Sequence, residues 1–218
     1  MKTNFIENAL NLFFPPACGM CGQISASYIC EYCYEYLKTR AKNRLDSYDD
    51  KYFSKHFWIF EYKDEIREKI IDYKFNDKSY LYRTFLEIIL NNEQAIKYIQ
   101  SFDIIIPVPI HKKRLKTRGY NQCELISKSL CKQIDNVVYR NDLIIKVNNI
   151  KPQSTLTKIE RAENIIGAYE ISKPEILRDR KILLIDDIYT TGSTVNECSK
   201  ILSETNCETI GVFSLAKD

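Results

Sequence analysis

Two neighbouring aspartates and a cluster of hydroxyl side chains are the residues of this sequence best suited to binding a ligand. Residues 181–195 read KILLIDDIYTTGSTV, so an apolar run leads into Asp186 and Asp187 and then into a polar turn. Carboxylates accept hydrogen bonds from the vicinal hydroxyls of a sugar, and backbone N–H groups at the start of a helix bind phosphate. The pattern predicts a phosphorylated sugar whose phosphate contacts Thr190, Thr191, Gly192, Ser193 and Thr194. An ordinary strand–turn–helix corner with exposed charges is the alternative.

A basic segment follows another apolar run and could bind a second phosphate group. After IIIPVP the sequence continues HKKRLKTRGYNQ, which concentrates lysine and arginine. Arginine binds phosphate through two parallel hydrogen bonds, and lysine binds it as a point charge. We therefore expect a pyrophosphate group to contact Lys112, Arg114, Arg118 and the tight turn at Gly119. A solvated basic loop is the alternative.

The acidic segment and the basic segment can bind one ligand only if the strands that precede them end side by side. The short apolar runs FDIIIPVP, LIIKV, KILLID and ETIGVFSLA alternate with helical patterns such as NQCELISKSLCKQI. This alternation is typical of a parallel sheet covered by helices on both faces, so we expect an α/β fold. Ligands of such sheets bind at the carboxyl ends of the strands, where the acidic pair and the basic segment would both lie.

Residues 183–195, LLIDDIYTTGSTV, resemble the signature of phosphoribosyltransferases that bind phosphoribosyl pyrophosphate. The resemblance implies a twisted, mainly parallel sheet with a variable hood, and a substrate held with Mg²⁺. It also implies that Asp186 and Asp187 contact the ribose hydroxyls. The reaction would displace pyrophosphate from C1 of the ribose, and the candidate catalytic residues are Asp186, Asp187, Arg118 and Arg161.

A long polar stretch, residues 148–172, separates two of the apolar runs and carries Lys158, Arg161 and Asn164. Long loops in compact domains are usually functional. The stretch resembles the flexible lid that closes over the substrate in such enzymes and excludes water from the reacting centre. A solvent-exposed connector is the alternative.

Four cysteines near the N-terminus form two CxxC pairs, in the segment CGMCGQISASYICEYC. Two such pairs can place four thiolates tetrahedrally around Zn²⁺, and a site without an open position is structural. This N-terminal cysteine head, which includes residues 18–33, is too small to have a core of its own, and a metal would supply its folding free energy. We predict zinc at Cys18, Cys21, Cys30 and Cys33; a pair of redox disulfides and four unligated cysteines are the alternatives.

The cysteine head combined with the other segments resembles the ComF family of competence-associated phosphoribosyltransferase-like proteins. The resemblance rests on FEYKDEIREKIIDYKF, PVPIHKKRLKTRGYNQ, KPQSTLTKIERAENIIGAYEI and LLIDDIYTTGSTV, and it covers nearly the whole chain. RGYNQ stands where the family has RGFNQ, and Gln153, Arg161 and Asn164 match the family's polar pattern. The resemblance implies a function in the uptake or processing of transforming DNA, with DNA-uptake proteins as partners. It predicts a zinc-binding head with its linker in residues 1–45 and a phosphoribosyltransferase-like domain in residues 46–218.

Composition narrows the class of protein. The chain has 218 residues, 44% of them hydrophobic, which is enough to bury a core. Its 32 basic and 29 acidic residues leave a net charge of +3, so the overall charge does not demand a nucleic-acid partner. We find no apolar run long enough to span a membrane and no continuous signal-peptide core, and we expect a cytoplasmic protein.

Two functions of different classes remain open. The first is an enzyme that transfers a phosphoribosyl group, with Mg²⁺, to an acceptor that the sequence does not identify. The second is a non-catalytic competence protein that senses a ligand or binds single-stranded DNA. Basic and aromatic residues are mixed in the head, and they could stack on bases and neutralise phosphates; they are Tyr28, Tyr32, Tyr34, Tyr36, Lys38 and Arg40. The tyrosines could equally pack the head onto the main domain.

Overall fold

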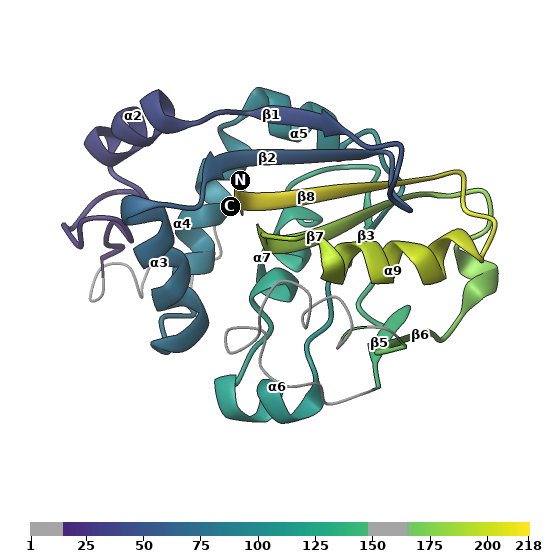
Figure 1. The fold of residues 1–218 in the computed structure, drawn as a ribbon. Helices are drawn as coiled ribbons and strands as arrows, with labels where there is room; N and C mark the ends of the chain where they lie inside the picture. Colours follow the sequence, from purple (N-terminus) through teal and green to yellow (C-terminus); the bar gives the residue numbers. More distant parts are fainter. Residues whose placement is uncertain (1–14, 148–164, 166) are drawn as a thin grey trace.

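The computed structural model describes residues 15–147, 165 and 167–218. Six strands in this part of the chain form one mixed sheet in the order β1-β2-β8-β7-β3-β4, with β1 antiparallel to β2 and the other neighbours parallel (Figure 1). The strands are β1 (Arg44–Ser47), β2 (Lys55–Glu61), β3 (Ile104–Pro107), β4 (Val138–Tyr139), β7 (Lys181–Tyr189) and β8 (Thr209–Lys217). The expected α/β fold with a mainly parallel sheet is confirmed.

Helices cover both faces of this sheet. The helices of the described residues are α2 (Glu31–Arg40), α3 (Asp64–Phe75), α4 (Leu81–Leu90), α5 (Glu93–Ile99), α6 (Lys112–Arg118), α7 (Gln122–Leu130), α9 (Ser193–Ser203) and the short 3₁₀ helix η2 (Pro174–Ile176), of which α6 and η2 bury no residue. Alternate residues of β7 point to opposite faces. Leu183 and Ile185 pack into a core with α3, α4, α5 and α7. Ile182 and Leu184 pack into a second core that includes α9.

The segment LIIKV is not part of the large sheet, contrary to our expectation. It forms β5 (Ile144–Lys146), which pairs antiparallel with β6 (Tyr169–Ile171) in a separate two-stranded sheet. In Figure 1 this pair and α6 both lie below β7 and α9. A short apolar run fits a strand of a small separate sheet as well as a central strand, so the sequence pattern alone does not distinguish the two.

The cysteine head packs directly against α4. A Cβ atom on Gly19 would lie 2.2 Å from Oγ1 of Thr84, so only glycine allows this approach. Thr84 donates to the carbonyl of Tyr28 at 2.8 Å, and the N–H of Ile29 donates to Glu87 at 2.9 Å. The predicted domain boundary at residue 45 falls within β1, and the division at that residue stays a prediction.

No helix among the described residues is long and apolar enough to cross a membrane.

Candidate functional site

A cavity of about 650 Å³ lies at the carboxyl end of β7. The β7–α9 turn, the end of α3, helix α6 and the β5–β6 pair all contribute to its wall. Nine of the predicted site residues line it: Arg114, Arg118, Asp186, Asp187, Thr190, Thr191, Gly192, Ser193 and Thr194. Lys112 and Gly119 are not among the lining residues. Arg161, with the central part of the predicted lid, lies outside the described residues.

The hydroxyl-rich turn leads into the N-terminus of α9, which begins at Ser193. The hydroxyls of Thr191 and Ser193 are 2.7 Å apart, and the N–H of Ser193 donates to Thr191 at 3.3 Å. Gly192 has a φ of 72°, and a Cβ atom there would lie 2.2 Å from the hydroxyl of Tyr189. The turn therefore requires glycine, and it brings hydroxyls and helix N–H groups to the cavity wall.

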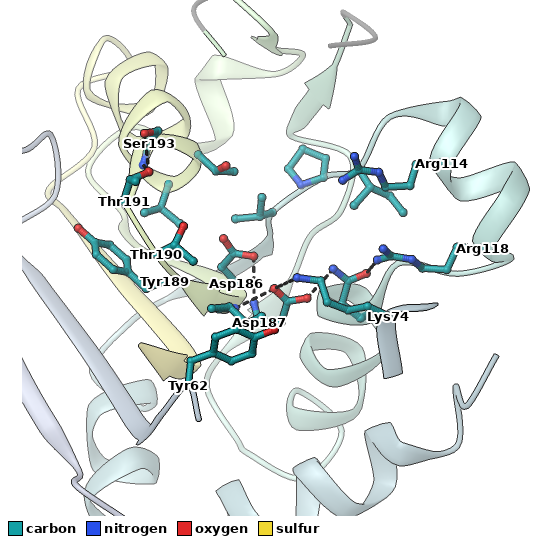
Figure 2. Close-up of a pocket in the computed structure, with 18 of the residues that line it drawn as sticks. Tyr62, Lys74, Arg114, Arg118, Asp186, Asp187, Tyr189, Thr190, Thr191 and Ser193 are labelled. Atoms are coloured by element: carbon teal, nitrogen blue, oxygen red, sulfur yellow. Dashed lines mark hydrogen bonds and ion pairs between the residues drawn. The ribbon is translucent and has the colours of Figure 1, made fainter. Parts of the chain in front are cut away.

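Asp187 is held by the protein itself. Its Oδ1 accepts from Nζ of Lys74 at 2.9 Å and from the N–H of Ile188 at 2.7 Å, and its Oδ2 accepts from Nε2 of Gln122 at 2.7 Å. The residue is only 3% exposed. Figure 2 shows Asp187 beside Lys74, whereas Asp186 lies between the turn and the arginines. Of the two carboxylates, Asp186 is the one placed to meet a ligand.

Burial and the adjacent charge of Asp187 raise the pKa of Asp186 to about 7. Its Oδ1 accepts from the N–H of Asp187 at 2.9 Å and lies 3.8 Å from the thiol of Cys123. Burial also raises the pKa of Cys123 well above the ordinary thiol value, which keeps this thiol protonated as a donor. Asp186 is thus protonated more readily than an ordinary carboxyl group.

Cations surround the rest of the cavity. Burial and the charge of Arg114 lower the pKa of Lys146 to about 8, and its Nζ donates to the hydroxyl of Tyr169 at 2.9 Å. Arg118 donates to Oε1 of Gln122 and lies over the ring of Phe75, 5.2 Å from its centroid. Residues 112–118 of the basic segment form helix α6, which the sequence did not predict. The sequence of α6, KKRLKTR, has no apolar periodicity that would predict a helix, because none of its residues packs into the core.

Sequence reasoning missed three polar residues of this site: Lys74, Gln122 and Lys146. Lys74 is the second-last residue of α3, and nothing in its local sequence distinguishes it from the other basic residues. Gln122 stood inside the quoted segment RGYNQ, whose resemblance marked it without assigning a function. Lys146 belongs to the run LIIKV, which we expected in the central sheet.

The four head cysteines come together in space. Their Sγ atoms all lie within 4.8 Å of one another, and those of Cys21 and Cys30 are 3.8 Å apart. Zn–S bonds of about 2.3 Å in a tetrahedron place neighbouring sulfurs roughly 3.8 Å apart. No disulfide joins the cysteines of the described residues. The cluster is compatible with a structural zinc ion.

The fold is that of a phosphoribosyltransferase-like protein, and comparison with known proteins agrees. Residues 121–218 match the family described as "Phosphoribosyl transferase domain". The chain is 30% identical to "Competence protein F" of Haemophilus influenzae over 93% of this chain and 85% of that protein. It is 29% identical to "Competence protein ComFC" of Streptococcus pneumoniae, over 74% of this chain and 68% of that one, and 26% identical to the Bacillus subtilis protein of that name, over 86% and 71%. The chain belongs to the competence protein F (ComF) family.

Proposed function

We propose that this chain binds phosphoribosyl pyrophosphate at the end of β7, transfers its phosphoribosyl group to an acceptor, and serves DNA uptake during competence. One observation carries the proposal: Asp186 faces a cavity that has a hydroxyl-rich helix N-terminus on one side and two arginines on the other (Figure 2). The ribose diol of the ligand would need Asp186, its 5′-phosphate would need the helix N-terminus, and its pyrophosphate would need the arginines. The competence proteins to which the chain is similar support the physiological part of the proposal.

Each protein group would act on a different part of the ligand. Asp186 would accept hydrogen bonds from the two ribose hydroxyls and so fix the orientation of C1. The turn at residues 190–194 would hold the 5′-phosphate with hydroxyls and N–H groups at the positive end of α9. Arg114 and Arg118 would neutralise the charge that develops on the leaving pyrophosphate, which is the larger part of catalysis in such displacements. Arg161, a further candidate, lies outside the described residues.

Mg²⁺ fits this site only in part. Because three donors hold both oxygens of Asp187, Asp186 is the carboxylate of the pair that remains for an ion. The ion would supply charge neutralisation to the pyrophosphate oxygens. For the head, we propose that Cys18, Cys21, Cys30 and Cys33 hold a structural Zn²⁺.

Isothermal titration calorimetry with phosphoribosyl pyrophosphate and Mg²⁺ tests the proposal. We expect saturable binding to the wild type, and at least tenfold weaker binding, about 1.4 kcal/mol, when Ser193→Ala removes a hydroxyl from the turn. Ser203→Ala, at the exposed end of the same helix, is the matched control and should bind as the wild type does. Absence of wild-type binding, or equal affinity in Ser193→Ala, would contradict the proposed ligand.

A second candidate function, binding of single-stranded DNA, is favoured by another cavity. This cavity of about 540 Å³ lies between the head and helices α3 and α4, and its lining includes Lys69, Lys78, Arg83, Tyr28 and Tyr80. The side chain of Tyr80 is 55% exposed, so its ring is available to a base. One head tyrosine packs against the main domain instead, because Tyr34 donates to the carbonyl of Asn91.

Filter binding of a single-stranded oligonucleotide over a salt series tests this candidate. Contacts to phosphates predict that the affinity falls steeply as the salt concentration rises. Tyr80→Ala should weaken binding at every salt concentration, whereas Tyr52→Ala, at an exposed tyrosine that does not line the cavity, should leave it unchanged. A weak signal that does not depend on salt would exclude the candidate.

A further inference from the structure

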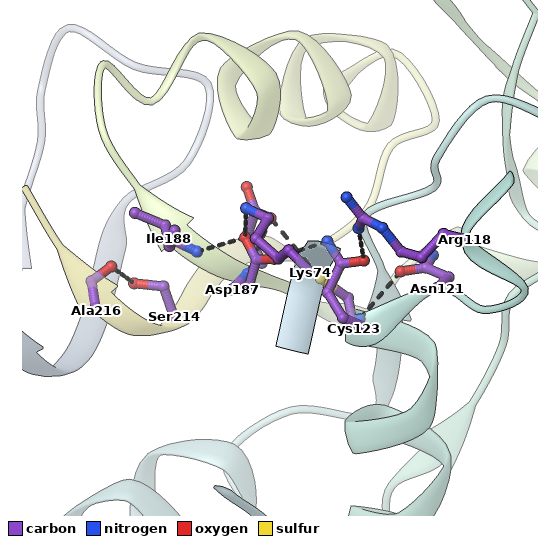
Figure 3. A network of polar contacts seen from close by, with 10 residues as sticks. Lys74, Arg118, Asn121, Cys123, Asp187, Ile188, Ser214 and Ala216 are labelled. Carbon is purple, nitrogen blue, oxygen red and sulfur yellow. Dashed lines mark hydrogen bonds and ion pairs between the residues drawn. The ribbon is translucent and has the colours of Figure 1, made fainter. Parts of the chain in front are cut away.

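Lys74 reaches the acidic pair from a distant part of the chain. It is the second-last residue of α3, and α3 precedes the region that matches the phosphoribosyl transferase domain. Its Nζ lies 2.9 Å from Oδ1 of Asp187, with the lysine side chain 19% and the aspartate 3% exposed. Figure 3 shows Lys74 and Asp187 at the centre of a network that also contains Arg118. This ion pair is therefore an internal feature of the site, not a surface contact.

Donors from the protein occupy three of the about four lone-pair positions of the Asp187 carboxylate. Oδ1 accepts from Lys74 and from a backbone N–H, and Oδ2 accepts from Gln122. The amide orientation of Gln122 is fixed in turn, because its Oε1 accepts from Arg118. Each printed hydrogen-bond partner of this carboxylate is a donor, so an ion between the two acids would compete with the lysine ammonium for the same negative charge.

The positive charge of Lys74 stands where the two adjacent carboxylates would otherwise need a metal ion or a proton. Ligand atoms of Cys123, Asp186 and Asp187 lie within 4.8 Å of one another, a spacing that a metal ion could use. Two adjacent buried carboxylates without a cation are strongly unfavourable, so one takes up a proton or both take up an ion. Burial alone would disfavour the lysine charge, but the two aspartates outweigh it, and the pKa of Lys74 is raised. The ammonium is fixed there as the cation of the pair.

We propose that Lys74 is the built-in counter-ion of this site, a positioning residue that takes the place of a divalent cation on the protein side. The protein then holds a phosphorylated sugar without a metal ion on the acidic pair. The second statement rests on the proposed function, because it assumes that the ligand is a phosphorylated sugar. The first concerns the protein alone and has a test of its own.

Titration of the zinc-loaded protein with Mn²⁺, followed by the electron paramagnetic resonance of free Mn²⁺, tests the first statement. The wild type should show no site at the acidic pair. Lys74→Met should gain one Mn²⁺ site at least tenfold tighter than any in the wild type, and Asp187→Asn in that background should remove it. Lys74→Arg should behave as the wild type does. Lys78→Met is the matched control, because it removes a lysine that forms an ion pair with Asp72 near the same helix.

Two results would overturn this assignment. One is a Lys74→Met protein that binds Mn²⁺ no more tightly than the wild type does. The other is a wild-type Mn²⁺ site that Asp187→Asn removes, and this measurement holds even if Lys74→Met does not fold.

Ribose 5-phosphate, which carries no pyrophosphate, tests the second statement by calorimetry in metal-depleted buffer and then with Mg²⁺. We expect equal affinities within about twofold, a difference under about 0.4 kcal/mol. A requirement for Mg²⁺ would contradict the inference. Absence of binding in both buffers would instead contradict the proposed function, and the Mn²⁺ result would still decide the state of the acidic pair.

Discussion

Replacement of Asp186 by asparagine should stabilise the protein while it abolishes ligand binding. Burial and the neighbouring Asp187 raise the pKa of Asp186 from the ordinary value of 3.8 to about 7 in the folded state. Between these values the folded protein holds a proton that the unfolded chain has released. The stability from this proton is therefore complete below the unfolded pKa and is lost as the pH rises through the folded pKa. Asparagine has no such proton to lose.

The structure sets the size of the effect. A pKa raised from 3.8 to about 7 corresponds to at most about 4 kcal/mol of stability. Asparagine also loses the attraction between the carboxylate and the ammonium of Lys74, which reduces the gain. We expect the variant to be more stable than the wild type by roughly 1–3 kcal/mol above about pH 7.5, and by almost nothing near pH 4.

Urea unfolding of zinc-loaded protein at several pH values measures this difference. The difference in free energy of unfolding between variant and wild type should grow from about pH 4 to about pH 7.5 and then level off. Asp135→Asn, at an exposed carboxylate beyond α7, controls for the chemical change itself. A variant less stable than the wild type at about pH 8, or a gain that does not change with pH, would refute the reasoning.

Three further predictions concern the turn, the basic helix and the cysteine head. Gly192→Ala should lower the free energy of unfolding by about 1–2 kcal/mol more than Gly22→Ala in urea melts, because only the first adds a Cβ atom 2.2 Å from a ring hydroxyl while both have positive φ; equal losses would contradict the packing argument. In calorimetry, Arg114→Ala should weaken binding of phosphoribosyl pyrophosphate at least tenfold, about 1.4 kcal/mol, and leave ribose 5-phosphate unaffected; parallel losses would remove the pyrophosphate assignment. Cys33→Ser should lose bound zinc and melt at lower temperature, whereas Cys207→Ser should keep the metal, as metal analysis and thermal unfolding would show.

The features that the sequence predicted correctly are local ones. The strand, turn and helix around Asp186 are continuous in the chain, so the apolar run, the glycine and the hydroxyls together specify their geometry. The two CxxC pairs likewise carry their spacing in the sequence, and the structure brings all four thiols together. Local order of residues is sufficient for both features.

The features that the sequence did not predict depend on distant contacts. Lys74 and Gln122 reach Asp187 across 113 and 65 residues of chain, and only the packing of α3 and α7 against β7 brings them there. From the sequence, both aspartates looked equally available to a diol. The packing divides them, with Asp187 held by the protein and Asp186 left at the cavity.

The central claim is that a sugar diol and its 5′-phosphate bind side by side where β7 leads into α9, and a crystal structure of the complex with phosphoribosyl pyrophosphate tests it most directly. We predict density for the ribose hydroxyls at hydrogen-bond distance from Asp186, and for the 5′-phosphate at the N–H groups of residues 190–194. Ligand density elsewhere on the protein, or a phosphate turned away from that helix N-terminus, would contradict the account.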